Sequence, residues 1–574
     1  GSLLVALTVI PLLASRVIKG NQNRRNWLER MAGLSEYFVR GVTALYTGIL
    51  RLALRTRLLT VGLAVFFWIV TMRLVPPLIG GELMPLMDTG IVNLEFETPP
   101  QYSPPEVEEV LYQIENLIYQ NKHVLSVSSV IGSEPGEISF GGGGATAQSG
   151  KLVIHLIDRT QRKETIWEIQ DQWRQSISHI PGVKSFRINE YGATPLSTTR
   201  APLDIIISGP DRRILDHLAD ECLTKLKGIP GLVDVRRSWY LDKPEFTIQV
   251  DPTLARLYQT SPQEIALELK TMLKGISPTA MRLNDYLDIP ITVQYAGRFL
   301  QQPGQLSQTY VTTNEGLLPL RALATDQASY DQPFITRERL QHTIDITGVN
   351  RVYTIAQVGK MVQTRLANWP LPAGYSIEVA GTITDMKLGN EEMGKALKIG
   401  FILLYLLLVA MFQSFRHPLT IMSAIPLAVA GGLWGLLLFD KPLCKPATMG
   451  LILLGGTIVN NSILLLDFII RAREKGMNRN EAILNSVRLR IRPILMTTVS
   501  TIVGLTPLVF EMAVGLERMS PLGIVAFMGL LIGTFLTIIV VPVIYALLDS
   551  AAVAGASVIS FLRFKHREME NKSS

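Results

Sequence analysis

Two adjacent amides stand in the middle of a long apolar run. The run covers residues 447–470, and its centre reads Thr457-Ile458-Val459-Asn460-Asn461-Ser462. Amide side chains are unfavourable in hydrocarbon unless they face other helices or water. The pair therefore either holds helices together by hydrogen bonds or forms part of an ion pathway, and the sequence leaves both open. Because an amide does not titrate, the pair cannot itself carry a proton.

Acidic residues keep away from the middle of every apolar run. Asp440, Asp467, Glu511 and Asp549 all lie at or towards the ends of runs. If protons drive this protein, we expect the titrating carboxylates to lie on a piece that is not part of this chain.

The sequence gives little support for a nucleotide site, a metal site or a catalytic site. Gly141 to Gly144, with Ser149-Gly150-Lys151, superficially resemble a phosphate loop, but the spacing is one residue too long and Leu152 replaces the Ser or Thr that binds magnesium. We interpret this stretch, beside Phe140, as a mobile loop that joins two strands. The seven His and two Cys are scattered, so we predict no metal site, no cofactor and no catalytic triad.

The composition indicates a membrane protein. Hydrophobic residues make up 48% of the 574 residues and charged residues only 18%, which excludes a disordered chain. A helix crosses a bilayer with about 20 apolar residues. Six runs meet this test, at 58–79, 396–415, 418–439, 447–470, 490–511 and about 521–548. A shorter stub, Leu3 to Ala14, is typical of the end of a helix whose beginning is missing.

Lys and Arg set the expected orientation. Segment 15–57 holds nine of them against two acids, and loop 471–492 holds seven against two. The positive-inside rule places both, with the C-terminal tail, in the cytoplasm, so that 80–392 is external. Apolar residues at helical spacing over 22–57 favour an amphipathic helix on the inner membrane face, with a soluble linker helix as the alternative. Basic residues cluster beside apolar runs, which argues against nucleic acid as a partner.

The external segment repeats one pattern. Strands and helices alternate from 91 to 188 and again from 203 to 236. Two helix-to-strand connections share the same sequence motif, Ile180-Pro181-Gly182 and Ile229-Pro230-Gly231, and Leu371-Pro372-Ala373-Gly374 is a looser copy. Proline and glycine end a helix and redirect the chain. We therefore predict ferredoxin-like βαβ subdomains, with an insertion over about 241–333.

This layout resembles the C-terminal half of a resistance–nodulation–division (RND) permease, and most closely its hydrophobe/amphiphile efflux branch. The resemblance covers essentially the whole chain, and four phrases carry it: Gly80-Gly81-Glu82-Leu83-Met84-Pro85, Gly455 to Asp467, Arg490-Ile491-Arg492-Pro493-Ile494-Leu495-Met496-Thr497-Thr498, and Val541-Pro542-Val543-Ile544-Tyr545. It implies a polytopic α-helical membrane protein, the second six-helix repeat of an RND transporter, with a large α+β periplasmic domain.

The resemblance also implies a division of the chain. Its parts are 1–17 as the end of span six, 18–57 as a cytoplasmic amphipathic linker helix, 58–79 as span seven, 80–200 as the first porter subdomain, 201–240 with 334–382 as the second, 241–333 as a docking subdomain, 383–415 as a connecting helix and span eight, 416–439 as span nine, 446–470 as span ten, 471–489 as a cytoplasmic loop or helix, 490–511 as span eleven, 520–549 as span twelve and 550–574 as a cytoplasmic tail.

Candidate site residues follow from the same resemblance. In the family, two Asp on span four relay protons with partners on spans ten and eleven. Asn460 stands where a Lys is frequent, Asn461 matches the Asn beside it, and Arg490 and Thr497 match the basic and hydroxyl positions. The missing Lys departs from the family pattern. As a result, no cation is present at this position to pair with the Asp carboxylates when they lose their protons. The loop that separates two substrate pockets matches Phe140, Gly141, Gly142, Gly143 and Gly144.

We therefore expect half of a proton-driven exporter of amphiphilic compounds, a secondary transporter and not an enzyme. The expected partners are the N-terminal half, two further copies in a homotrimer, and a periplasmic adaptor and outer-membrane channel, in the inner membrane of a bacterium. A metal-ion exporter of the same superfamily and a non-transporting fragment or assembly partner are the alternatives. We expect Cys222 and Cys444 not to form a disulfide, because one lies in a large domain and the other in a short loop at the membrane surface.

Overall fold

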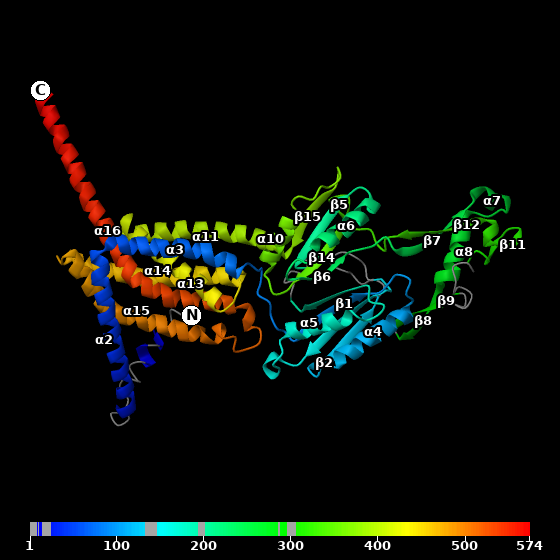
Figure 1. The fold of residues 1–574 in the computed structure, drawn as a ribbon, viewed down its shortest axis with the longest axis horizontal. Helices are drawn as coiled ribbons and strands as arrows, with labels where there is room; N and C mark the ends of the chain where they lie inside the picture. The colour runs from blue at the N-terminus through cyan, green and yellow to red at the C-terminus, as the bar shows by residue number, and fades with distance from the viewer. Residues whose placement is uncertain are drawn as a thin grey trace.

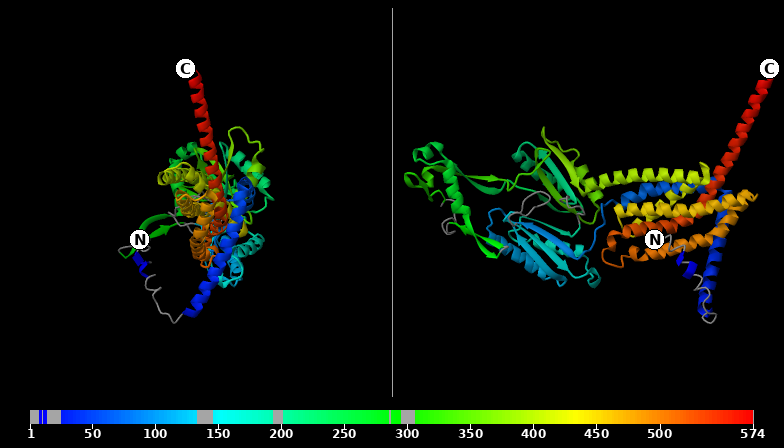
Figure 2. Two further views of the ribbon diagram at one scale, coloured as in Figure 1. Left: turned by 90° about the vertical axis from the view of Figure 1, so that its left-hand side faces the viewer. Right: turned by 180° about the vertical axis from the view of Figure 1, so that it is seen from behind.

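The computed structural model describes residues 8–9, 11–13, 25–132, 146–192, 201–284, 287–294 and 306–573. The molecule is elongated, with a bundle of helices at one end, two sheets in the middle and a small unit at the far end (Figure 1). The view from behind shows the same order of parts (Figure 2). The predicted membrane and α+β regions are thus separate in space. The stub Leu3 to Ala14 lies mostly outside the described residues.

The described part of the chain contains six helices long and apolar enough to span a membrane, as the sequence predicts. They are α3 (Arg57–Ile79), α11 (Thr382–Phe412), α12 with α13 (Arg416–Met422 and Ala424–Leu438), α14 (Lys445–Glu474), α15 (Arg479–Val509) and α16 (Ser520–Ser573). Two details differ from the apolar runs. The connecting segment and the span form one helix, α11, and run 418–439 is divided at Ser423.

Helices α13 and α16 form the centre of the bundle. The apolar windows of these spans are 61% and 67% buried, against 6% for α11 and 11% for α3. Small residues allow the two to approach closely. A Cβ added to Gly435 would lie 2.6 Å from the Cβ of Met528, so only glycine fits there. The outer helices leave most of their surface open to lipid or to other helices.

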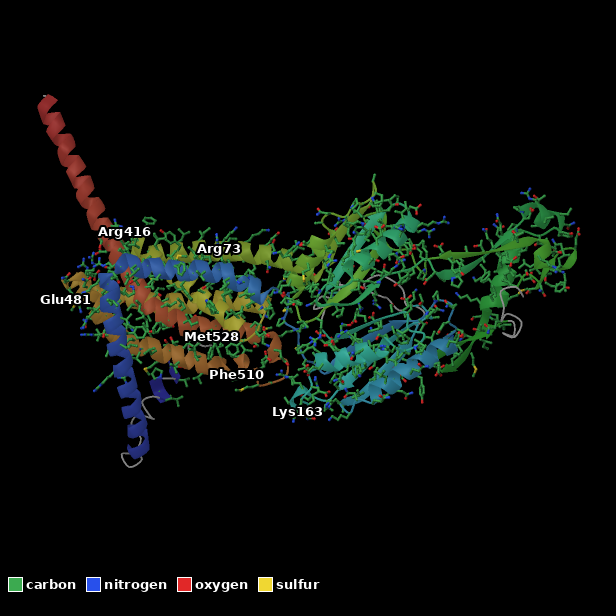
Figure 3. The ribbon with its side chains drawn as sticks, viewed as in Figure 1. Arg73, Lys163, Arg416, Glu481, Phe510 and Met528 are labelled. Atoms are coloured by element: carbon green, nitrogen blue, oxygen red, sulfur yellow. The ribbon has the colours of Figure 1, made fainter. Side chains whose placement is uncertain are left out.

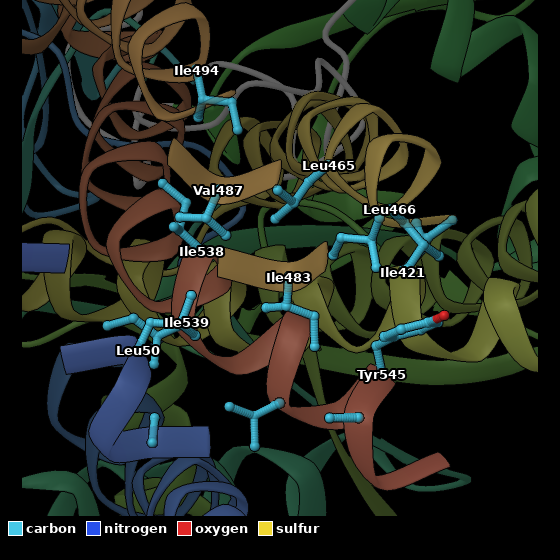
Figure 4. Packing of buried hydrophobic residues seen from close by; sticks show 14 of the residues in the cluster. Leu50, Ile421, Leu465, Leu466, Ile483, Val487, Ile494, Ile538, Ile539 and Tyr545 are labelled. Carbon is cyan, nitrogen blue, oxygen red and sulfur yellow. The ribbon is translucent and has the colours of Figure 1, made fainter. Parts of the chain in front are cut away.

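A cluster of buried hydrophobic side chains joins several helices of the bundle (Figure 4). Leu466 of α14, Val487 of α15 and Tyr545 of α16 meet there with Leu50 of α2 (Arg25–Arg55). The predicted helix before the first span is therefore present. Its second half packs on the bundle through Tyr46, Leu50 and Leu54.

The first sheet unit has the strand order β2-β3-β1-β4. It consists of β1 (Ile91–Glu97), α4 (Pro104–Tyr119), β2 (Val124–Ile131), β3 (Ser149–Leu156), α5 (Ile166–Ile177) and β4 (Ser185–Glu190). Half-buried and buried residues alternate along strand β1, because α4 and α5 pack on one face of the sheet. Ser103 and Glu106 form the predicted capping box before α4.

The second sheet unit repeats this order with strands from distant segments. It consists of β5 (Leu203–Gly209), α6 (Arg212–Leu226), β6 (Leu232–Arg237), β14 (Gln341–Asn350), α10 (Ile355–Leu366) and β15 (Ser376–Gly381). The strands lie in the order β6-β14-β5-β15, with the short β13 (Arg337–Glu338) also on β14. Both units are thus ferredoxin-like, and the predicted fold class is confirmed. At the shared joints, Gly182 and Gly231 have φ of 89° and 76°, which glycine adopts without strain.

An inserted unit separates β6 from β14. Its ladder pairs β7 (Lys243–Val250) with β12 (Ala324–Asp331), and it carries α7 (Pro252–Leu257), α8 (Pro262–Lys274), the hairpin β8 (Ile276–Asn284) and β9 (Leu287–Val293), and the hairpin β10 (Tyr310–Thr313) and β11 (Gly316–Pro319). The ladder leads to a separate small core around Ile265 and Met272 at the far end of the molecule (Figure 1).

A buried carboxylate ties the α+β region to the bundle. Glu82 follows α3 and is 8% exposed. Its backbone N–H donates to the carbonyl of Leu443, between α13 and α14, at 3.1 Å. Its Oε1 accepts from Asn350 Nδ2 at 3.0 Å and from the N–H of Ile355, in the first turn of α10, at 2.7 Å. Burial, aided by the charge of Glu190, raises the pKa of Glu82 to about 7.

We predict that Glu82 makes stability fall as pH rises. Its folded pKa lies above the ordinary 4.5, so the folded state binds more protons between about pH 4.5 and 7 and is favoured at the acid end. Glu82→Gln keeps an oxygen for both hydrogen bonds and removes the charge, so at pH 8 it should be more stable by roughly 2–3 kcal/mol. Thermal unfolding in detergent at pH 5 and pH 8 measures the difference. The exposed Glu108→Gln serves as control, and an unchanged pH dependence in Glu82→Gln would contradict the prediction.

The two cysteines are free and buried, as expected. Cys222 belongs to the core of the second sheet unit and Cys444 to a core within the bundle. Burial raises the pKa of the Cys222 thiol to about 12, so very little reactive thiolate forms near neutral pH.

We therefore predict that alkylation without reductant adds two labels in denaturant, while Cys222 reacts slowly in the folded protein. Intact mass before and after denaturation measures this. A second label that appears only after reduction would show a disulfide and overturn the assignment.

Candidate functional site

Helices α14 and α15 run side by side in opposite directions, and one contact fixes their relative height. The guanidinium of Arg490 on α15 lies over the ring of Phe468 on α14, 3.8 Å from its centroid. Thr497 lies seven residues after Arg490, and Asn461 seven residues before Phe468. Each residue adds about 1.5 Å and seven make about two turns, so Asn461 and Thr497 lie at about the same depth, above that contact. The structure thus places the polar centres of the two helices at one level.

Asn460 lies on a surface of α14 that no described helix covers. It is exposed, as are Gly456 and Leu464 one turn to either side, whereas Ile458 and Val459 are buried. Asn461 is half-buried. The adjacent amides therefore have different surroundings, as their offset of about 100° requires. Neither amide has a hydrogen bond to any part of the chain that the structure describes.

Thr497 continues the open surface on α15. It is exposed, and its hydroxyl donates to the carbonyl of Ile494 on its own helix at 2.9 Å. Met496, which is 64% exposed, lies beside it. We name the surface formed by Gly456, Asn460, Leu464, Met496 and Thr497 the open face.

Buried hydroxyls that the sequence analysis did not single out lie behind the open face. Thr498 and Thr534 of α16 are 6% and 3% exposed, and their hydroxyl oxygens are 3.3 Å apart. Ser462 is also buried and donates to the carbonyl of Ile458 at 3.0 Å. The signal for Thr498 was its place in the Arg490–Thr498 phrase, but only the packing of α16 shows which of the two adjacent threonines is enclosed.

Arg490 lies about two helical turns before Thr497 on α15. Its Nε is buried and has no hydrogen-bond partner among the described residues. The contact with Phe468 is a cation–π interaction, which compensates part of the lost hydration.

The predicted site residues therefore divide into two groups. The first group lies on two adjacent helices, although no hydrogen bond among the described residues joins the amides to Arg490 or to Thr497: Asn460, Asn461, Arg490 and Thr497. The predicted substrate loop, Phe140 to Gly144, lies outside the described residues.

An apolar groove lies elsewhere on the bundle. It has a volume of about 580 Å³ and is lined by Phe67 of α3, Trp434 and Leu438 of α13, and Met528, Leu531, Ile532, Phe535 and Leu536 of α16. Trp434 is held in place because its Nε1 donates to the hydroxyl of Thr71 on α3 at 3.1 Å. Its lining suits an apolar molecule or an acyl chain.

Comparison with known proteins places this arrangement in a family. Residues 1–549 match the model of the AcrB/AcrD/AcrF family. Two crystal forms of a heavy metal efflux pump have similar folds, with TM-scores of 0.80 and 0.78 at 20% identity. The matches cover 89% and 88% of this chain but 52% and 51% of the pump, so the chain spans about half the length of the structures it resembles. The chain belongs to the AcrB/AcrD/AcrF family of RND efflux transporters, which are secondary transporters and not enzymes.

Proposed function

We propose that the chain is the C-terminal half of a proton-driven RND exporter of amphiphilic and hydrophobic compounds and works with an N-terminal half. The open face carries this proposal. An exposed amide at mid-span is unfavourable against lipid, so this surface of α14 and α15 is suited to another polar surface rather than to acyl chains. A companion six-helix half with carboxylates at this level would accept hydrogen bonds from Asn460, while the hydroxyl of Thr497 already donates to the carbonyl of Ile494.

In this proposal the roles are divided by chemistry. Asn460 donates a hydrogen bond to a companion carboxylate but supplies no positive charge. The carboxylates then hold protons to higher pH than they would beside a Lys, since no cation stabilises their charged form. Thr497 offers a hydroxyl on the proton path, and Arg490 offers the charge at one end of it. Asn461 faces a different neighbour.

Two observations bear on the substrate. The apolar groove, with its large aromatic and aliphatic lining, favours amphiphilic or hydrophobic molecules. The similar solved structures are described as heavy metal efflux pumps, which supports a metal ion as the second candidate. A non-transporting assembly partner is the third. We place the protein in a bacterial inner membrane as a homotrimer, with the α+β region in the periplasm, where an adaptor and an outer-membrane channel would join it.

The first test is transport by the separate and combined halves. The chain expressed alone in a pump-deleted host should leave dye accumulation unchanged, because its described spans hold no carboxylate at mid-depth. Together with its N-terminal half it should lower dye accumulation, in a manner that a protonophore abolishes. Zn²⁺, Cu⁺ and Ag⁺ tolerance are measured in the same cells. Protection from metals without dye efflux would replace the proposed substrate, and dye efflux by the chain alone would contradict the need for a companion.

The second test is the open face. Asn460→Leu should lower proton-driven dye efflux in vesicles about tenfold or more, and Thr497→Ala and Arg490→Ala should lower it too, while protein levels stay constant. Asn460→Lys should move the pH profile of efflux to lower pH, because a cation lowers the pKa of neighbouring carboxylates. Leu464→Met, one turn along the same surface, is the matched control. Wild-type efflux in Asn460→Leu would mean that the amides only hold helices together.

A further inference from the structure

A second buried carboxylate lies where the first sheet unit meets the bundle. Glu517 belongs to the short helix Leu516–Arg518 between α15 and α16 and is 4% exposed. One of its oxygens accepts from the backbone N–H of Gly515 at 2.7 Å. The other lies 2.7 Å from Nη1 of Arg159. Arg159 comes from the segment between β3 and α5, so this ion pair joins the α+β region to the membrane helices.

Arg159 holds the same loop by its backbone as well. Its Nη2 donates to the carbonyl of Glu511 at 2.6 Å and to that of Ala513 at 3.4 Å. The carboxylate of Glu511 is in turn 2.6 Å from Nζ of Lys441, which lies between α13 and α14. Three segments that are distant in the sequence thus share one charged cluster.

In a neighbouring contact the arginine belongs to the membrane helices and the acceptor to the first sheet unit. Arg518 donates to the carbonyl of Gly192, just after β4, at 2.9 Å. Gly192 has a φ of 88°, which favours glycine, and a Cβ there would lie 2.6 Å from Nη2 of Arg518, so a larger residue would displace the guanidinium. Figure 3 shows Phe510 at the end of the bundle that faces the first sheet unit, and Lys163 on the side of that unit nearest to it.

The helices that carry the open face end at this cluster. Helix α15 bears Arg490 and Thr497 and ends at Val509, two residues before Glu511. Helix α14 bears Asn460 and begins at Lys445, whose N–H donates to the carbonyl of Leu83 at 3.2 Å. Glu511 lies about 20 Å from Thr497 along α15. Because a helix is stiff along its axis, a shift of α15 at Thr497 also shifts Glu511.

We propose that Arg159, Glu511, Glu517 and Lys441 form an ionic joint that transmits displacement of α15 to the first sheet unit. The joint rests on the proposed function, because it is the step that would link proton movement to substrate movement. Separating a buried ion pair leaves an uncompensated charge, so the joint moves as one body instead of opening. The second sheet unit is attached differently, because β15 continues directly into α11. The two sheet units are also joined to each other, by Arg174 with Asp234 at 3.0 Å and by Arg236 with Glu95 at 2.6 Å. A shift of α15 therefore turns the first sheet unit about these contacts and changes the distance between its outer helix α4 and the helix α10 of the second unit.

The experiment uses the chain with its N-terminal half. Spin labels at Glu108→Cys on α4 and Lys360→Cys on α10, both exposed, report the distance between the sheet units, while the native cysteines are buried. We expect the distance distribution to differ between pH 5.5 and pH 8, and Arg159→Ala to abolish that difference and to lower dye efflux about tenfold or more. Arg159→Lys keeps the charge and should retain part of both. Glu517→Gln should behave like Arg159→Ala, and it keeps an oxygen for Gly515.

Arg212→Ala is the matched control, because Arg212 pairs with Asp331 at 2.9 Å on the far side of the second sheet unit. It should leave both readouts unchanged. The joint is overturned if Arg159→Ala and Glu517→Gln, present at normal levels, keep the pH-dependent distance change, or if the unmodified protein transports without any such change. If the unmodified protein shows the distance change but no proton-driven efflux, the proposed function fails, and the variants still decide the joint. If it shows neither, both fail.

Discussion

A polar group in hydrocarbon needs a partner, and this requirement governs the bundle. Where partners exist within the chain, the group is enclosed, as Thr498 is against Thr534. Asn460, whose side chain has no partner among the described residues, lies on the outside of α14, at about the level of the exposed Thr497 on α15. The close packing of α13 on α16 keeps the bundle together without using that surface. The bundle can therefore hold its helices together by apolar packing and still present a polar surface on α14 and α15.

The α+β region solves a different problem, in water, with one supersecondary pattern used twice. Both sheet units place the strand that follows their first helix at an edge and bury two helices on one face. The inserted unit begins after such an edge strand, β6, and returns at the start of β14. An edge tolerates an insertion because no neighbour on that side has to be displaced, so the second unit keeps its core around Ile205 and Ile344.

Buried charged side chains connect the helix bundle to the α+β region. Glu82 ties the second sheet unit to the loop between α13 and α14, and Arg159 ties the first sheet unit to the loop between α15 and α16. Both carboxylates at these attachments, Glu82 and Glu517, are at least nine-tenths buried. Buried polar contacts are directional and costly to leave unmade, so they fix the orientation of the sheets on the helices more strictly than apolar packing would.

The sequence by itself determined the spans, the repeated helix-to-strand connections and the capping box at Ser103. The length of an apolar run, a Pro-Gly motif and local hydrogen bonds all depend on neighbouring residues in the chain. It also marked Asn460, Asn461, Arg490 and Thr497. Only the tertiary structure decided that Asn460 is exposed while Asn461 is half-buried, that Thr498 rather than Thr497 is enclosed, and that Arg159 meets Glu517. These depend on side chains hundreds of residues apart or on which side of a helix a neighbour covers, and helical periodicity fixes only the angle between residues, not which angle faces a partner.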